Sequence, residues 1–353
     1  MAYSAIVKPS VYFNTKLYTG DGSTSHTISG VGFEAGLTWI KGRNFTSSHH
    51  TIDQVRGGTK NIMPDNTGAE QSDNMINSWN SDGFNLNNYS EVNSNSNTFV
   101  SWNWKAGTTS GIPTDAETNI TPTAYSFNQT NGFSIVKYTG TGTSGEGVPH
   151  GLNAKPQMII VKRLNAIESW QVFTQPQLNT SNATKYLKLD ANNAEATSNS
   201  RWNGWQPDTY NFYLGNDGSV NASGGTYIAY VFAAKTGFSK FGSYTGNGNA
   251  NGPFIYTGFK PAFVLHKKSS AADDWNIFDN KRNPHNVVNK YLIPNSTGAE
   301  GTSTNRDFLS NGFKIRSSSN YVNQSGQTFI YMAFAEEPLV ANSGTDGVPA
   351  TAR

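Results

Sequence analysis

Three glutamates end a short loop motif that occurs three times, and they are the first residues that could do chemistry. Glu70 and Glu300 end the sequence Thr-Gly-Ala-Glu, and Glu195 ends Asn-Asn-Ala-Glu. Such a carboxylate can bind Ca²⁺ or a ligand, or accept hydrogen bonds from backbone amides of its own loop. Glycoside hydrolysis needs two carboxylates at a defined separation, and no second acid recurs beside these three. We therefore interpret them as structural loop acids and expect neither catalytic residues nor an enzyme.

Two aspartates occupy similar places in the first and last thirds of the chain. Asp53 is followed by Arg56, and Asp279 is followed by Lys281 and Arg282. The middle third has Phe-Thr-Gln there and lacks the acid. This pattern favours an ion pair within the loop over a binding role.

The dipeptide His49-His50 is the most metal-like pair in the sequence. Adjacent residues of a strand point to opposite faces, so the two rings cannot easily bind one ion. The chain has no cysteine and no HExxH motif, whereas a structural metal usually takes four protein ligands. We expect no metal site and no cofactor.

Four tryptophans lie outside the longest apolar runs, in segments rich in Asn, Asp and Ser: Trp79, Trp202, Trp205 and Trp275. An exposed indole beside such side chains can stack on a sugar, so these four are the candidate contacts for a surface glycan. Tryptophan also fills the cores of β-proteins. Trp275 aligns with Trp170, which favours packing at that position.

The elements that would position these residues are repeated three times along the chain. The first repeated motif contains Tyr-Thr-Gly at 18–20, 138–140 and 244–246. A turn and an apolar strand follow at 37–41, 156–162 and 261–267, and a closing strand ends each repeat at 98–104, 226–232 and 328–334. The same order of motifs, three times over, establishes an internal repeat.

The closing strands show the period of two that a buried sheet face requires. Nine large, mostly apolar residues occupy the alternate positions: Val100, Trp102, Trp104, Ile228, Tyr230, Phe232, Ile330, Met332 and Phe334. The opposite face is expected to be only partly covered. No helical periodicity extends beyond about two turns.

We therefore predict an all-β protein of three tandem β-sandwich, jelly-roll-like units. The predicted domain ranges are an N-terminal docking arm at 1–16, unit 1 at 17–107, a linker at 108–131, unit 2 at 132–236, unit 3 at 237–337 and a C-terminal tail at 338–353. The linker is rich in Thr, Pro, Gly and Asn, so unit 1 is expected to be more loosely hinged than units 2 and 3.

Composition excludes several classes of protein. Charged residues make up 14% of the 353 residues and the net charge is +2 without basic runs, which argues against nucleic acid as a partner. No apolar stretch reaches the roughly 18 residues of a membrane helix, so we expect no membrane insertion. The first residues lack the pattern of a signal peptide. Without cysteine, stability must come from packing.

The motifs resemble a repeat found in structural proteins of marine tailed bacteriophages, such as those of cyanobacteria and other abundant ocean bacteria. The resemblance rests on residues 8–20, on 31–41 and on 98–107, and it extends over most of the chain. It implies a non-enzymatic protein of the virion surface, made in the host cytoplasm. The implied role is a tail-fibre-like appendage that presents loops for host attachment.

Two alternatives remain open from the sequence. One is a head decoration or tail cement protein without host contact, and the other is a glycan depolymerase, which the missing acid pair disfavours. No heptad or collagen-like segment is present to build a trimeric shaft. We expect a homo-oligomer that docks on other virion proteins through its two terminal arms and contacts a host surface glycan through its loops.

Overall fold

The computed structural model describes residues 4–175 and 181–339, and this part of the chain is built almost entirely of β-strands. Its helices are single short turns: η1 (Pro9–Val11), α1 (Ser90–Asn93), α2 (Asn199–Trp202), α3 (Gly218–Asn221) and α4 (Asn320–Asn323). The all-β prediction is confirmed, as is the expectation that no long helix forms in these residues.

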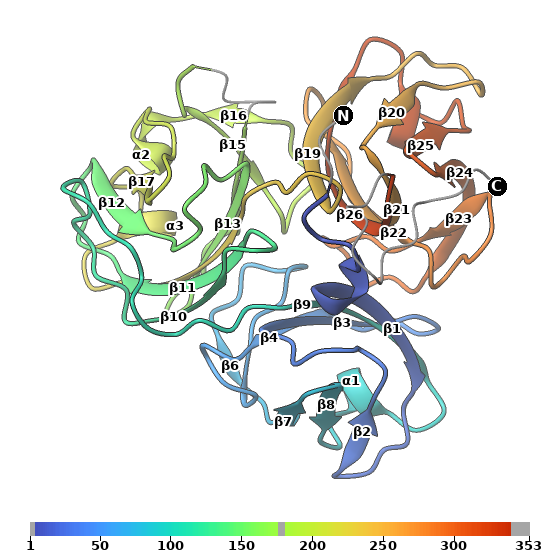
Figure 1. Cartoon of the computed structure of the whole chain (residues 1–353), viewed down its shortest axis with the longest axis horizontal. Helices are drawn as coiled ribbons and strands as arrows, with labels where there is room; N and C mark the ends of the chain where they lie inside the picture. Colours follow the sequence, from blue (N-terminus) through green and yellow to red (C-terminus); the bar gives the residue numbers. More distant parts are fainter. Residues whose placement is uncertain (1–3, 176–180, 340–353) are drawn as a thin grey trace.

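Each of the three units has one larger sheet in which the closing strand lies between two partners (Figure 1). In unit 1 the order is β1 (Phe13–Thr19), β9 (Thr98–Trp104), β3 (Leu37–Gly42) and β4 (His49–Asp53). Unit 2 has β10 (Ala124–Asn128), β11 (Phe133–Thr139), β18 (Thr226–Phe232), β13 (Met158–Arg163), β14 (Gln171–Thr174), β15 (Lys185–Lys188) and β16 (Ala196–Thr197). Unit 3 has β19 (Ser239–Thr245), β26 (Thr328–Pro338), β21 (Phe259–Lys268) and β22 (Trp275–Asp279).

Each unit also has a smaller sheet, with fewer residues in its strands, although in unit 3 both sheets have four strands. In unit 1 it contains β2 (His26–Ile28), β8 (Gly83–Leu86) and β7 (Ile76–Asn80), with a separate pair of β5 (Lys60–Asn61) and β6 (Gln71–Ser72). Unit 2 has β12 (Glu146–Pro149) and β17 (Asn211–Leu214). Unit 3 has β20 (Phe254–Tyr256), β25 (Gly312–Ile315), β24 (Gly301–Leu309) and β23 (Val288–Tyr291).

The larger and smaller sheets of each unit enclose a separate apolar core. Phe99, Tyr227 and Phe329, on the outward face of the three closing strands, belong to these cores and are fully buried. The tyrosine of each Tyr-Thr-Gly motif stacks on one of these rings, with centroids 5.0–5.1 Å apart. The expectation that this face of the closing strands is only partly covered is therefore wrong.

The opposite face of the three closing strands forms a fourth core, which the units share. All nine alternating residues predicted from the sequence are buried in it. Trp104 lies at its centre, with ring centroids 6.4 Å from Phe133 and Phe232 and 5.8 Å from Phe334. The units therefore surround a common axis, as Figure 1 shows, and unit 1 is packed as closely as the other two, contrary to the hinge expected from the linker.

The segments expected to be a linker and an N-terminal arm are folded onto the body. Residues 124–128 form β10, which pairs with β11, and Thr108 bridges to Phe127. Ile6 and Pro9 are buried, and Phe13 begins β1 inside the shared core. Of the expected C-terminal tail only Pro338 and Leu339 belong to the described residues; the rest lies outside them.

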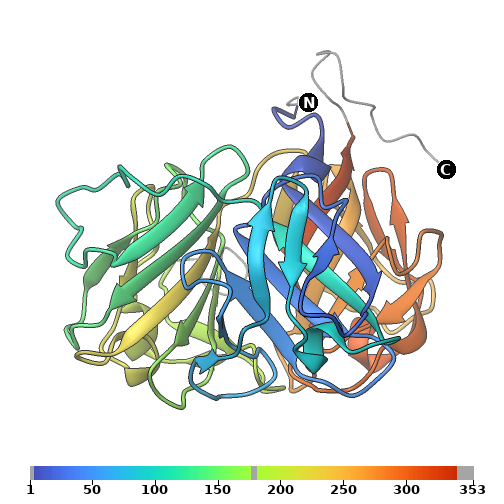
Figure 2. The ribbon, with the colours of Figure 1, turned by 90° about the horizontal axis from the view of Figure 1, so that it is seen from below.

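The body has two distinct sides along this axis (Figure 2). At one, the terminal side, a Cβ on Gly237 would meet both Ser4 and Pro338, so the two described ends of the chain lie together. At the other, the loop side, each closing strand begins opposite a Tyr-Thr-Gly threonine, as in Thr98 with Thr19. The loop side therefore carries equivalent segments from all three units.

Candidate functional site

The three recurring glutamates lie in contacts between units. The backbone N–H of Glu70 donates to the carbonyl of Leu164 in unit 2, at 2.8 Å. Glu195 binds Ser269 of unit 3 in the same way, and Glu300 binds Arg43 of unit 1. The loops thus connect unit 1 to 2, 2 to 3 and 3 to 1, which closes a ring.

Three fully buried lysines support the same ring. Lys41, Lys162 and Lys267 occupy equivalent places in β3, β13 and β21. Their ammonium groups donate across the unit boundaries to the carbonyls of Thr297, Thr67 and Asn192, at 3.3, 3.1 and 3.3 Å. Burial lowers the pKa of each lysine to about 8. These lysines were not predicted from the sequence, although each stands at the end of a repeated apolar strand.

The side chain of Glu300 adds an ion pair across units, whereas Glu70 pairs with Arg56 and Glu195 with Lys185 of its own unit. Arg43 donates two hydrogen bonds to Glu300, which also lies within 3.4 Å of Arg282 and 3.3 Å of Lys290. Burial alone would raise the pKa of Glu300, but the Arg43 hydrogen bonds and the three positive charges lower it overall. Each recurring acid thus makes contacts within or between units, and its interpretation as a structural residue stays a prediction.

The two aspartates also bridge units. Asp53 pairs with Arg56 at 2.6 Å and accepts a hydrogen bond from the Tyr230 hydroxyl of unit 2 at 2.8 Å. The equivalent Asp279 pairs with Arg282 and accepts from the indole of Trp102 in unit 1. The predicted loop ion pairs are confirmed for Arg56 and Arg282. The structure adds a partner from the neighbouring unit in both cases.

His49 and His50 face different surroundings, as adjacent strand residues must. His49 accepts from the Trp39 indole and makes a 3.0 Å contact with the Ile293 carbonyl of unit 3. His50 pairs with Glu91 at 2.6 Å. Burial lowers the pKa of His49 well below its usual value. Among residues 4–175 and 181–339 no group of three metal-ligating side chains is found.

The structure separates the four candidate tryptophans. Trp275 is buried and donates to the Lys188 carbonyl of unit 2, as Trp170 does to Met63 of unit 1. Trp202 is buried against Phe173. Neither ring can therefore stack on a surface glycan in this structure, which corrects that prediction for both. Burial removes their faces from solvent.

Trp79 and Trp205 remain accessible. Trp79 is half-buried in β7 and its indole lies 3.4 Å from the Thr38 hydroxyl. Trp205 is 51% exposed, and its ring lies edge-on to Tyr213 with centroids 5.3 Å apart. Asp208 accepts a hydrogen bond from the Tyr213 hydroxyl, which holds the Tyr213 ring in place beside Trp205. Trp205 is therefore the most accessible of the four candidates.

Three buried asparagines, Asn93, Asn221 and Asn323, organise the loop side and were missed from the sequence. The side chain of each accepts from the residue after the motif glycine and donates to two loop carbonyls, as Asn221 does with Thr141, Thr143 and Gly215. A repeated Val-Asn dipeptide was the available signal. The motif glycine is also explained, because a Cβ on Gly20 would lie 2.2 Å from the Ser94 carbonyl oxygen.

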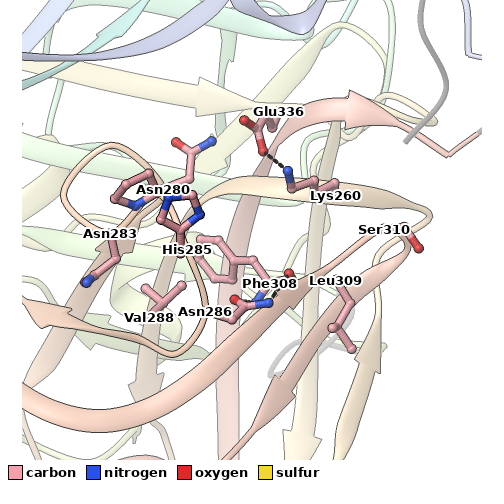
Figure 3. A pocket seen from close by; sticks show the side chains of 11 residues that line it. Lys260, Asn280, Asn283, His285, Asn286, Val288, Phe308, Leu309, Ser310 and Glu336 are labelled. Carbon is pink, nitrogen blue, oxygen red and sulfur yellow. Dashed lines mark hydrogen bonds and ion pairs between the residues drawn. The ribbon is translucent and has the colours of Figure 1, made fainter. Parts of the chain in front are cut away.

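A pocket of about 250 Å³ opens in unit 3 on the terminal side (Figure 3). The ion pair of Lys260 with Glu336, at 2.8 Å, forms one wall. Figure 3 shows the loop that carries His285 facing the turn that carries Ser310 across the opening. Asn286 anchors the loop by binding both the N–H and the carbonyl of Phe308. The pocket offers amides, a hydroxyl, an imidazole and a neutralised ion pair.

Comparison with known proteins identifies the family. A family model described as a domain of unknown function, DUF7483, matches residues 8–338. The chain therefore belongs to the DUF7483 family, and one match spans all three units and their shared core. A search of curated proteins found no match. In the described ranges, no helix is long and apolar enough to cross a membrane.

Proposed function

We propose that this member of the DUF7483 family is a non-enzymatic structural protein of a bacteriophage virion surface, of a tail-fibre-like kind, whose three units present loops for host attachment. The proposal includes the view that the units are tandem copies of one jelly-roll-like β-sandwich. The repeated strand order and the three equivalent buried asparagines support that view.

One structural observation carries the proposal: the body has a side that can be anchored and an opposite side where loops of all three units gather. Ser4 and Pro338 lie together at the terminal side. The loop side includes the turns at 20–25, 94–97, 140–145, 222–225, 246–252 and 324–327, which contain a single charged residue, Asp21. Charged residues of the same side, Arg43, Arg163 and Lys268, stand beside the starts of the closing strands. Hydroxyl and amide groups both donate and accept hydrogen bonds, as recognition of a neutral glycan requires.

The closed ring supports a presenting role. Each unit binds both neighbours through its glutamate loop and its buried lysine, so the loops keep fixed positions relative to one another. Side chains on a fixed frame lose less entropy on binding than side chains on hinged domains. One chain also closes its own threefold core, so the predicted homo-oligomer would form through other surfaces, with docking to virion proteins at the terminal side.

Electron cryomicroscopy of intact particles tests the proposal. We expect density of this protein at the tail, with the terminal side inward and the loop side outward. Regular density over the head shell would instead support the alternative of a decoration protein without host contact.

A second measurement separates attachment from chemistry. Purified full-length protein should bind host cells without shortening their surface polysaccharide. Release of oligosaccharides, lost in a Glu or Asp variant, would overturn the non-enzymatic part of the proposal.

A further inference from the structure

A second pocket in unit 3, of about 220 Å³, lies between the two sheets toward the loop side. It is formed by β22, β23, β24 and the N-terminal end of α4. Besides Ile293 and Val322, its wall contains two tyrosines, two asparagines, two serines and an aspartate: Tyr291, Tyr321, Asn276, Asn305, Ser303, Ser319 and Asp274. It is smaller than the roughly 300 Å³ at which pockets for drug-sized ligands begin. One ring-sized group would fill it.

In unit 2 the corresponding place is filled by the protein itself. Tyr186 stands before the first buried leucine of its strand, as Tyr291 does in unit 3. The guanidinium of Arg201 stacks over the Tyr186 ring at 4.4 Å and donates to Gln171, which occupies the place of Asn276. Asp217, the N-cap residue of α3, neutralises the Arg201 guanidinium.

In unit 1 the same place is also closed. His50 takes the position of Asn276, and it is bound by Asn61 and by Glu91 of α1. The distance from the His50 Nε2 to the Glu91 carboxylate is 2.6 Å. Two of the three equivalent places therefore satisfy their polar groups internally.

Unit 3 has lost the internal occupant. Arg306 stands six residues after Glu300, as Arg201 does after Glu195, but its guanidinium turns into the core. It stacks there over Phe278 at 3.8 Å and donates to His266. The pocket that remains contains an unsatisfied group: Asn305 is only 5% exposed, and its Oδ1 has no hydrogen-bond partner among the described residues.

The wall chemistry indicates which ligand would replace the arginine. The helix cap that neutralises Arg201 in unit 2 is an aspartate, whereas α4 is capped by Ser319. Asp274 is already bound by the Asn295 amide at 2.7 Å. No lysine or arginine is found among the described residues that line the pocket. The site thus has no positive charge to hold an anion, and its amides and hydroxyls suit a neutral molecule with many hydroxyls.

We propose that this pocket binds one neutral sugar ring of a glycan, with an apolar face of the ring against Tyr321 and its hydroxyls on Asn276, Asn305 and Ser303. Tyr321 is 62% exposed and forms the outer edge of the site. The amides and hydroxyls can donate and accept, as sugar hydroxyls do. The inference deepens the proposed function by naming the ligand class, and it rests on that function only for the source of the glycan.

Ligand-observed NMR with the full-length protein tests the inference. The probes are glucose, galactose and mannose, with glucuronic acid and arginine as charged competitors. We expect saturation transfer from at least one neutral hexose, and at least a tenfold loss of affinity in Tyr321→Ala. Tyr256→Ala is the matched control, because this tyrosine is 49% exposed in the same unit and does not line the pocket.

Other outcomes would overturn the inference. They are absence of binding by all three hexoses, preference for arginine or glucuronic acid, or unchanged binding in Tyr321→Ala with loss in Trp205→Ala. Cell binding by the Tyr321→Ala protein at full strength would reject this pocket and leave the attachment function intact. Hexose binding by a protein that is located on the head shell would reject the attachment function and leave the sugar site in this pocket intact.

Discussion

Arg43 of unit 1 and Glu300 of unit 3 are 257 positions apart in the chain and share two hydrogen bonds, of 3.0 and 3.1 Å. The backbone of Arg43 also accepts the Glu300 N–H. Because this contact joins the first unit to the last, it converts three consecutive units into a closed ring. The ring, in turn, explains why the shared core needs no second chain.

Replacing Glu300 by glutamine should lower the free energy of unfolding by about 3 kcal/mol, because Arg43 loses its charged partner and the fully buried Arg282, which keeps Asp279, loses its second one. Urea unfolding followed by fluorescence measures the change. Glu195→Gln is the control: its partner Lys185 is 40% exposed, so the loss should stay below about 1 kcal/mol. Equal losses in both variants would contradict the difference in burial.

The Asp53–Tyr230 contact should show coupling between units 1 and 2. Tyr230→Phe removes two buried hydrogen bonds, one to Asp53 and one from Arg56, and should cost about 1–3 kcal/mol. Asp53→Ala should cost about 3–5 kcal/mol, because it leaves Arg56 buried without its nearest acid. In the double variant the two losses should not add, and a double-mutant cycle measures the coupling. Strict additivity would mean that the hydrogen bond contributes nothing to unit association.

Thermal unfolding should occur in one transition. The shared core places Trp104 of unit 1 against aromatic rings of units 2 and 3, so no unit can unfold without exposing apolar surface of the others. Tryptophan fluorescence and circular dichroism should therefore give coincident curves. Residues 132–236 expressed alone should not fold as a monomer. Three separable transitions would contradict the shared core.

Stability should fall in mild acid. Burial lowers the pKa of His49 and His266 well below 6.5 and that of His150 to about 4. Below pH 6.5 the unfolded chain binds protons at these three positions while the folded chain does not, so stability is present above this pH and is lost as the pH falls. Between pH 6 and 5 the loss should approach about 4 kcal/mol, at 1.36 kcal/mol per group.

Urea unfolding at pH 7, 6 and 5 measures this dependence. His49→Gln keeps a side chain that can accept from Trp39 and donate to Ile293, and it should reduce the slope by one proton. His285→Gln, in an exposed loop, serves as the control. An unchanged slope in His49→Gln would show that this ring does not contribute.

Arg306→Met should leave the protein as stable or more stable. The Nε and Nη1 groups of Arg306 are fully buried and have no hydrogen-bond partner within the described part of the chain. Burial lowers its pKa to about 10, which reflects the cost of a charge in the core. Replacing such groups by apolar side chains of similar volume is often neutral or stabilising by about 1–4 kcal/mol. A markedly lower melting temperature of the Arg306→Met protein would contradict this prediction.

The sequence alone determined the strand content, the threefold repeat and the buried face of the closing strands. These features depend on local composition and on the period of two, which any strand with one buried face must show. It also indicated the structural role of Glu70, Glu195 and Glu300, since their recurrence without a second acid argued against catalysis. The ion pairs of Asp53 and Asp279 followed from residues three positions apart.

Only the tertiary structure decided how the units meet. A period of two says that Trp102 and Tyr230 are buried but not that each donates a hydrogen bond to an aspartate of another unit. The same limit applies to Trp275, whose polar neighbours suggested exposure, because the partner that buries it comes from a distant segment. Arg201 and Arg306 make the point most clearly. They are equivalent in sequence, but Arg201 fills a surface site and Arg306 enters a core. The packing around each position, and not the residue type, decides which side-chain conformation has the lower free energy.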